Sequence, residues 1–564
     1  MKVKKMLAII LTLSLVLALV AACGSTDEPA ASSGGDPSSP VSTASPGPGT
    51  SAPPASPAPP ESPPPDVQLL DTIVHQIGSQ PIAVLNLLTP GSNSAPHHWA
   101  FIMMFDRLVE VDHWNNSVSS ALATDWDISD NYTTFTFNLR EDVVFHNGDK
   151  FTAQDVADTI RMAQRPLETD GPGGEIRPFG TLARELWSVV TEVNVLGDYR
   201  IELKLDEPDT DFILDLGHTA GSILNMAAIV ANDQTGPMIG TGAYKVVDFE
   251  SQSYVEFLRN DDYWGVMPLT ERQIWRFTPE MPVRTVMMQN GESHFAQSLP
   301  VTDTEAIFEP DPAYGLMSNL LGGGFGIFFN MNDPITGDIN FRKAVAATVD
   351  RAPIGMFVEG GGRWAILEDT GTFWGMRTRY RNNDIPIIPR DLDAAKAYLA
   401  ESSYNGETVS MAAATFHQVQ MANILQEQLR EIGVNISIDQ MEMLAMNDLM
   451  AYGNNAGQMA VMMGQMKATA NSSKSSLYPE AGNNKVNYNN PDVTALFDRA
   501  VISTDQAERE RLFKEIQVLV AEDLPVVMLY YRDNPIVFVA GLGGVVPPYE
   551  SDGWDLRNAF VVVE

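Results

Sequence analysis

The sequence predicts a mixed fold, α/β or α+β, with more than one β-sheet. Apolar and polar residues alternate over 134–139 and again over 201–205, which is the period of a strand with one buried face. Between these strands, Thr152 and Asp155 have the spacing of a capping box, and apolar residues recur after them at helical spacing. This half of the chain therefore contains both strands and helices.

The C-terminal half repeats the mixture. Apolar residues line one face of a predicted helix that ends at Gly433, and residues 434–438 then alternate as a strand. A second amphipathic helix around 512–520 runs into Pro525 and the apolar strand 526–531. A helix, a glycine cap and a strand in succession are typical of a layered α/β structure.

The N-terminus has the pattern of an export signal. Lysines precede an apolar run over residues 6–20, which is shorter than the roughly 20 residues that a membrane-spanning helix needs. The order Val20-Ala-Ala-Cys23 resembles the bacterial lipobox, so we expect a signal peptide over 1–22 and a lipid on Cys23. Cys23 is the only cysteine and has no internal disulfide partner. The alternative is an ordinary signal peptide whose cysteine lies near the cleavage point.

The segment after the cysteine is dominated by Ser, Pro, Ala, Gly and Thr. Such a composition buries too little apolar surface to order itself, so residues 23–66 are predicted to be a lipid-anchored, disordered tether. The formal net charge of the chain is −36, which disfavours nucleic-acid binding because that function needs a basic surface.

Five blocks of residues occur in an order that is typical of one protein family. The first block is Ala121-Leu-Ala-Thr-Asp-Trp-Asp-Ile-Ser129 with 132–140 and 143–156, and the second is 240–245 with 259–265. The third is 328–330 with Asp338, 342–344 and 350–351. The fourth is 393–396, and the fifth is 488–491 with Arg511, Glu515 and 524–525. Together they resemble the peptide/nickel-binding family of extracytoplasmic solute-binding proteins, which serve ATP-driven (ABC) importers.

This resemblance implies a two-lobed α/β periplasmic-binding-protein fold with a hinge and an extra α/β subdomain inserted in lobe I. By analogy, lobe I comprises 67–108, 236–312 and 533–564, the inserted subdomain covers 109–235, and lobe II covers 313–532. Solute would be enclosed between the lobes by hinge closure.

The resemblance also implies a function and partners. The protein would be a monomeric, non-enzymatic receptor without a cofactor, held on the extracytoplasmic face of the cell membrane by its lipid. It would deliver a peptide or other small organic solute to an ABC permease and ATPase.

Loops between the lobes should carry specificity. Candidate ligand contacts are side chains that offer hydrogen-bond donors, aromatic faces or a positive charge: His97, His98, Trp99, Phe325, Asn330, Arg363, Trp364, Trp374, Gln465 and Lys467. Each position has packing or a surface role as its alternative.

The loop at Gly464 departs from the family pattern. Peptide-binding relatives typically have Gly-Trp there, followed by an aspartate that pairs with the peptide α-amino group. Here Gln465 follows the glycine, and residues 467–471 contain no carboxylate. Because a buried ammonium needs a counter-charge, this departure argues against an ordinary free-amine peptide unless Glu368 or Asp369 replaces the aspartate.

There are three alternative functions, of which the first is another solute receptor of the same fold and the other two belong to different classes. His97 and His98 could bind a nickel chelate or another metal complex, although adjacent histidines in a strand would point to opposite sides. A sensory surface protein could keep the fold without transport. An enzyme is disfavoured because we find neither a Gly-x-Ser-x-Gly nor a His-Glu-x-x-His motif, so no catalytic residue and no resident metal site is assigned.

Other motif residues have structural explanations. His146 is expected to pack in the core beside a tight turn at Gly148, and Tyr263-Trp264 is expected to pack at the lobe surface. Gly240-Thr-Gly242 is expected to form a turn that needs unusual backbone torsions.

Overall fold

In the computed structural model the described residues all belong to one unit, 54–564. They are 67–77, 95–112, 117–165, 181–231, 239–358, 364–367, 370–374, 380–454, 456–464, 474, 476–479, 481, 484–547 and 554–563. In these ranges no helix is both long and apolar enough to cross a membrane.

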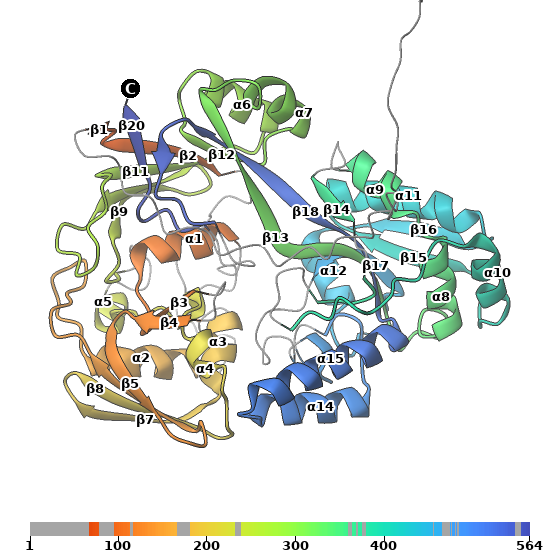
Figure 1. Cartoon of the computed structure of the whole chain (residues 1–564), viewed down its shortest axis with the longest axis horizontal. Helices are drawn as coiled ribbons and strands as arrows, with labels where there is room; N and C mark the ends of the chain where they lie inside the picture. The colour runs from red at the N-terminus through yellow and green to blue at the C-terminus, as the bar shows by residue number, and fades with distance from the viewer. Residues whose placement is uncertain are drawn as a thin grey trace, which may run out of the picture. The chain divides into compact units, whose positions relative to one another are not determined.

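A mixed sheet of eleven strands organises this unit, and its central pair is formed by β13 (Tyr314–Phe329) and β18 (Val526–Val539). Figure 1 shows them as two long arrows lying side by side, β13 in green and β18 in blue. Beyond β13 follow β17 (Met459–Gly464), β15 (Thr408–Ala413) and β16 (Asn435–Gln440). Beyond β18 follow β12 (Phe295–Gln297), β2 (Thr72–Ile77), β11 (Arg272–Phe277), β10 (Tyr254–Arg259) and β9 (Tyr244–Glu250), and β14 (Ala365–Leu367) also pairs with β18.

Smaller sheets lie outside this path. β5 (Ala123–Ile128), β6 (Thr134–Leu139), β8 (Arg200–Leu205) and β7 (Val190–Gly197) form an antiparallel sheet in that order. β3 (Val109–Asp112) pairs with β4 (Ser117–Ser120), and β20 (Phe560–Val563) pairs with β1 (Gln68–Leu69) and β19 (Leu542–Gly543). β6 and β8 confirm the two strands predicted from alternation.

The helical segments pack on these sheets. In chain order they are α1 (Ala95–Met104), α2 (Ala153–Ala163), α3 (Thr181–Ser188), α4 (Phe212–Asp215), η1 (Thr219–Gly221), α5 (Met226–Ala231), α6 (Met281–Gln289), α7 (Val301–Asp303), η2 (Thr304–Phe308), α8 (Ile339–Thr348), α9 (Arg351–Val358), α10 (Leu392–Ala400), α11 (Phe416–Arg430), α12 (Met443–Leu449), α14 (Pro491–Ile502) and α15 (Gln506–Asp523).

The local signals read from the sequence are present. Both arms of the capping box at α2 form, and Asp155 Oδ2 accepts a 2.9 Å hydrogen bond from the Thr152 backbone N–H. After α11, Gly433 has φ +88°, a conformation that glycine adopts without strain, and the chain turns directly into β16. The predicted helix at 512–520 is confirmed but is longer, because Asp505 caps it at the Ala507 and Glu508 N–H groups.

Apolar side chains pack in separate clusters. The first contains Phe137, Trp187, Phe257 and Trp275, which come from β6, α3, β10 and β11. Two further clusters are built from residues beyond 324, one around Phe329, Val345 and Leu425 and the other around Trp374, Phe497, Phe513 and Ile516. The N-terminal and C-terminal parts of the described chain therefore have their own cores, as two lobes require.

The Gly240-Thr-Gly242 turn corrects one prediction. Neither glycine has a positive φ, so unusual torsions are not the reason for them. A Cβ on Gly240 would lie 2.0 Å from the Met104 carbonyl oxygen, and one on Gly242 would lie 2.4 Å from the Met104 carbonyl carbon. Glycine is needed because the turn packs directly on the backbone of α1. His146 belongs to the same arrangement, since its Nε2 donates to the Gly242 carbonyl oxygen at 3.0 Å.

Candidate functional site

The first group of predicted contacts lies on α1 and faces η1. The segment is helical, which corrects the strand assumed for the adjacent histidines, since neighbours on a helix are about 100° apart around its axis. The His98 ring is buried, and its Nδ1 lies 2.8 Å from Thr219 Oγ1 in a hydrogen bond. The His218 ring packs edge-on against it with centroids 5.5 Å apart. Sequence reasoning missed His218 and Thr219 because the pairing joins distant segments.

Trp99 follows on the same helix. Its side chain is buried, and its indole Nε1 has no hydrogen-bond partner in the described part of the chain. A buried donor that lacks a protein partner is unusual and is commonly satisfied by water or ligand. Trp99 is also part of the first apolar cluster, so its contact with a solute stays a prediction.

The second group lies against β18. Trp364 and Trp374 are both buried, and the Trp364 carbonyl accepts a 2.9 Å hydrogen bond from the Asp533 N–H. The Tyr531 hydroxyl donates to the Trp374 carbonyl at 3.2 Å. The Nε1 of Trp374 has no hydrogen-bond partner among the described residues, as for Trp99. Both tryptophans thus accept hydrogen bonds from β18 through their backbone carbonyls, Trp364 from Asp533 and Trp374 from Tyr531.

Arg381 supplies the positive charge in this group. Its Nη1 donates to the Tyr531 hydroxyl at 2.9 Å and also to the Trp374 carbonyl, and its Nη2 donates to Thr370 Oγ1 at 2.8 Å. The guanidinium carbon lies 5.6 Å from the centroid of the Tyr531 ring. The sequence offered no signal for Arg381 beyond its nearness to Trp374.

Phe325 and Asn330 lie on or just after β13. Phe325 packs against Tyr530 with ring centroids 5.4 Å apart, within the second core. Asn330 is buried, and its Nδ2 donates to the Gly457 carbonyl at 2.6 Å while its Oδ1 accepts from Asn487 Nδ2 at 3.0 Å. These bonds within the protein are sufficient to explain why an asparagine stands at position 330. A contact between Asn330 and a solute stays a prediction.

The remaining predicted residues lie outside the described residues. They are Cys23 with its signal peptide and tether, the side chain of His97, and Arg363, Gln465 and Lys467. Glu368 and Asp369, the carboxylates considered as replacements for the family aspartate, also lie outside.

Two polar contacts join segments that belong to different predicted lobes. The Arg509 guanidinium donates to the Asp211 carboxylate, and both side chains are buried. Burial by itself lowers the pKa of Arg509, but the Asp211 carboxylate and Tyr380 raise it above its usual value, so the guanidinium stays charged. Trp364 Nε1 donates to Glu305 Oε1 of η2 at 2.9 Å. An arginine on the apolar face of α15 was the one sequence signal for the first contact.

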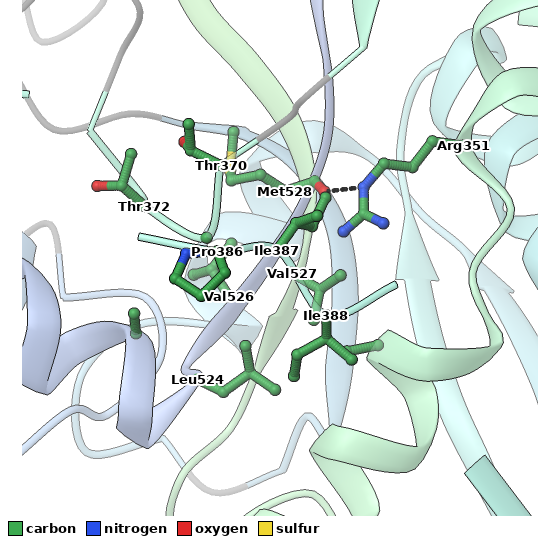
Figure 2. Close-up of a pocket in the computed structure, with 13 residues that line it drawn as sticks. Arg351, Thr370, Thr372, Pro386, Ile387, Ile388, Leu524, Val526, Val527 and Met528 are labelled. Carbon is green, nitrogen blue, oxygen red and sulfur yellow. Dashed lines mark hydrogen bonds between the residues drawn. The ribbon is translucent and has the colours of Figure 1, made fainter. Parts of the chain in front are cut away.

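A separate small hollow of about 40 Å³, partly open to solvent, lies beside the start of β18. Figure 2 shows Leu524, Val526, Val527 and Ile388 lining it. Its charged member is Arg351, whose Nε donates to the Met528 carbonyl at 2.8 Å. No predicted ligand contact lines this hollow, and its wall is mostly apolar.

Comparison with known proteins identifies relatives over most of the chain. A family model described as bacterial extracellular solute-binding proteins, family 5, matches residues 117–488. The Heme-binding protein A of Haemophilus influenzae is 25% identical over 455 residues, which are 75% of this chain and 80% of the relative. The Dipeptide-binding protein of Escherichia coli is 25% identical over 464 residues, which are 76% of this chain and 83% of the relative.

A solved structure has the same fold. The periplasmic binding protein DppA of Helicobacter pylori, in complex with the peptide STSA, aligns with a TM-score of 0.74 at 20% identity. The alignment covers 88% of this chain and 99% of that one. This likeness confirms the predicted two-lobed α/β fold.

Proposed function

The chain belongs to the bacterial extracellular solute-binding proteins of family 5, and we propose that it is the solute receptor of an ABC importer. The observation that carries this proposal is the family match over 117–488. In this role the protein captures a solute between its lobes and passes it to a permease driven by an ATPase. It performs no chemistry on the solute.

The solute is a peptide-like or other small organic molecule. The named relatives bind heme and dipeptides, so related proteins of this kind accept ligands of different shape. Buried indoles at Trp99 and Trp374 offer apolar contact together with hydrogen-bond donors, which suits an organic ligand with carbonyl or carboxylate oxygens.

Isothermal titration calorimetry against peptide and nutrient panels tests the proposal. We expect at least one small solute to bind and to raise the thermal unfolding temperature. If no solute binds or changes that temperature, the receptor function is wrong.

Paired variants then locate the site. Trp99→Phe removes the indole N–H and should weaken solute binding by about tenfold, the effect of one lost hydrogen bond. Trp187→Phe is the matched control, because Trp187 is equally buried in the first core and its Nε1 also lacks a partner among the described residues. Equal effects of the two variants would exclude Trp99 from the site.

Capture works by closure of the two lobes. A solute that touches both lobes binds the closed state better and shifts the population toward it. Small-angle scattering should therefore show a smaller radius of gyration when a saturating solute is added. An unchanged radius with solute bound would rule out closure.

The receptor works outside the cytoplasm as a monomer. Removal of residues 1–22 and lipidation of Cys23 would hold it at the membrane, and the tether over 24–66 would let it move above the surface. A receptor held in this way stays close to its permease.

The proposed function would change if the ligand were a metal complex or if the protein served sensing instead of transport. No group of three or more His, Cys, Asp or Glu side chains within the described ranges could hold a metal ion. Metal analysis of protein purified without a histidine tag distinguishes a metal-complex receptor from an organic-solute receptor. Permease and ATPase genes beside this gene would favour transport, and an isolated gene would favour sensing.

A further inference from the structure

The ion pair between Arg509 and Asp211 joins residues 298 positions apart. Only 3% of the Arg509 side chain and 6% of the Asp211 side chain are exposed. Arg509 lies in the first turns of α15, within predicted lobe II, and Asp211 lies just before α4, within the predicted inserted subdomain. The pair therefore bridges two predicted structural units.

The Arg509 side is built rigidly. Arg509, Phe513 and Gln517 follow one another at intervals of four and share one face of α15. The Tyr380 ring stacks on Phe513 with centroids 4.5 Å apart and an angle of 10° between the planes. Gln517 Oε1 accepts from the Asn382 N–H at 2.8 Å, which fixes the neighbouring backbone. Arg509 thus lies on a helix face that packs against residues 380–382.

The Asp211 side is also fixed. Asp209 Oδ1 accepts hydrogen bonds from the backbone N–H groups of Asp211 at 2.9 Å and of Phe212 at 3.1 Å. Phe212 packs in the first core, where its ring lies 4.9 Å from that of Phe135. The backbone at Asp211 is therefore held within the inserted segment by two hydrogen bonds to Asp209 and by the packing of the next residue, Phe212.

The apolar cores on the two sides are distinct. Phe212 and Leu216 belong to the first cluster, whereas Leu512 and Phe513 belong to the third. The Arg509–Asp211 ion pair therefore joins two bodies whose described apolar clusters are separate. The Glu207 carboxylate of the inserted segment also acts on Tyr478 of predicted lobe II: burial, the Asp498 carboxylate and the Glu207 charge together raise the pKa of Tyr478 to about 12.

A buried ion pair of this kind suits a reversible contact. Closing removes both charges from water, and their attraction offsets that cost only in good geometry, so the net gain is small. Opening returns both groups to water. An apolar interface of the same area would resist separation, because opening would expose it.

We propose that Asp211 and Arg509 form a latch that holds the inserted subdomain against α15 in the closed protein. The latch sets the balance between open and closed states even without solute. Its role in capture rests on the receptor function proposed above, but its effect on the solute-free protein does not.

Small-angle scattering of the solute-free full chain tests the latch. Asp211→Asn leaves the Arg509 charge without its counter-ion, so the ratio of closed to open protein should fall by about tenfold and the radius of gyration should rise. The double exchange Asp211→Arg with Arg509→Asp should recover part of the wild-type compactness. Arg511→Ala is the matched control on α15, because the Arg511–Glu515 pair is exposed and should leave the radius unchanged.

An Asp211→Asn protein that folds with wild-type compactness would overturn the latch, as would an equal change in the Arg511→Ala control. If Asp211→Asn does not fold, Arg509→Lys replaces it, since lysine keeps the charge but loses the forked geometry. Its radius must then exceed that of the wild type for the proposal to hold. Because no solute is used, failure of the latch and failure of the receptor function are separate results.

Discussion

The indole N–H of Trp264 donates a 2.8 Å hydrogen bond to the buried carboxylate of Asp106, 158 positions earlier in the chain. The same carboxylate accepts from the Thr241 hydroxyl at 3.0 Å and from the Tyr263 hydroxyl at 3.2 Å. Burial outweighs these bonds and raises the pKa of Asp106. Three motif residues of the sequence thus converge on one acid beside α1.

Asp106→Ala should lower the free energy of unfolding by about 2–4 kcal/mol, because it leaves one buried donor (Thr241) and two half-buried donors without an acceptor. Urea unfolding measures this loss. Asp261→Ala is the control, since the Asp261 side chain is 79% exposed and should change stability by less than about 0.5 kcal/mol. Similar losses in both variants would contradict the structural role of Asp106.

Gly242→Ala should destabilise the protein strongly, because the added Cβ would overlap the Met104 backbone, which cannot move as a side chain does. We expect a loss of roughly 2 kcal/mol or more in urea unfolding. Gly197→Ala is the matched control, since a Cβ there meets nothing within 4 Å. A Gly242→Ala protein as stable as the control would refute the close packing of this turn on α1.

Stability should fall as pH is lowered from about 6.5, because burial lowers the pKa of several histidines in the folded protein, most strongly that of two of them. Burial, with a smaller effect of His294, lowers the pKa of His75 to about 3, and burial lowers that of His146 to about 4. The unfolded chain takes up these protons near pH 6.5, so it binds more protons than the folded chain below that pH. Lowering the pH therefore favours unfolding.

Urea unfolding at pH 7.5 and at pH 5 measures this effect. His146→Gln removes one of the two groups, so its stability should depend less on pH than that of the wild type. The same pH dependence in both proteins would show that His146 does not titrate as its burial requires.

A bound peptide should tolerate acetylation of its α-amino group. The segment after Gly464 contains no carboxylate before Glu480, so no counter-charge is available there. We expect the dissociation constants of free and N-acetylated forms to differ by less than about tenfold. A loss of about 30-fold or more, the effect of removing one partner of a buried charge pair, would show that another carboxylate binds the amine.

Cys23→Ser should release the protein from the membrane fraction and abolish incorporation of labelled fatty acid. The thiol is the only site in the chain at which such an anchor could be attached to a cysteine. Deletion of residues 30–60 is the control, because it shortens the tether but keeps the anchor. Membrane retention of the Cys23→Ser protein would contradict lipidation at this residue.

Much of the local structure was predictable. The α2 cap, the strands at 134–139 and 201–205, and the Gly433 turn all depend on neighbouring residues, whose spacing is visible in the chain. The Gly240-Thr-Gly242 turn was located correctly but explained wrongly, because its tight neighbour is Met104 on a distant helix.

The ligand contacts of the candidate site stay predictions, and the structure shows only where some of these residues lie. Tryptophans at 99, 364 and 374 were singled out for their chemistry, and the structure buries all three. Arg381, His218 and Glu305 were missed, because each meets its partner through a fold that brings distant segments together.

The sequence by itself determined the short-range elements, since periodicity and caps are properties of neighbouring residues. Its ordered motifs indicated the family, and the resemblance to that family implied the two-lobed fold. Only the tertiary structure decided which buried charges meet. The partner of Arg509 is Asp211, although several other carboxylates lie closer in the chain. Ion pairing depends on distance in space and on the loss of water around both charges, and neither quantity is written in the order of residues.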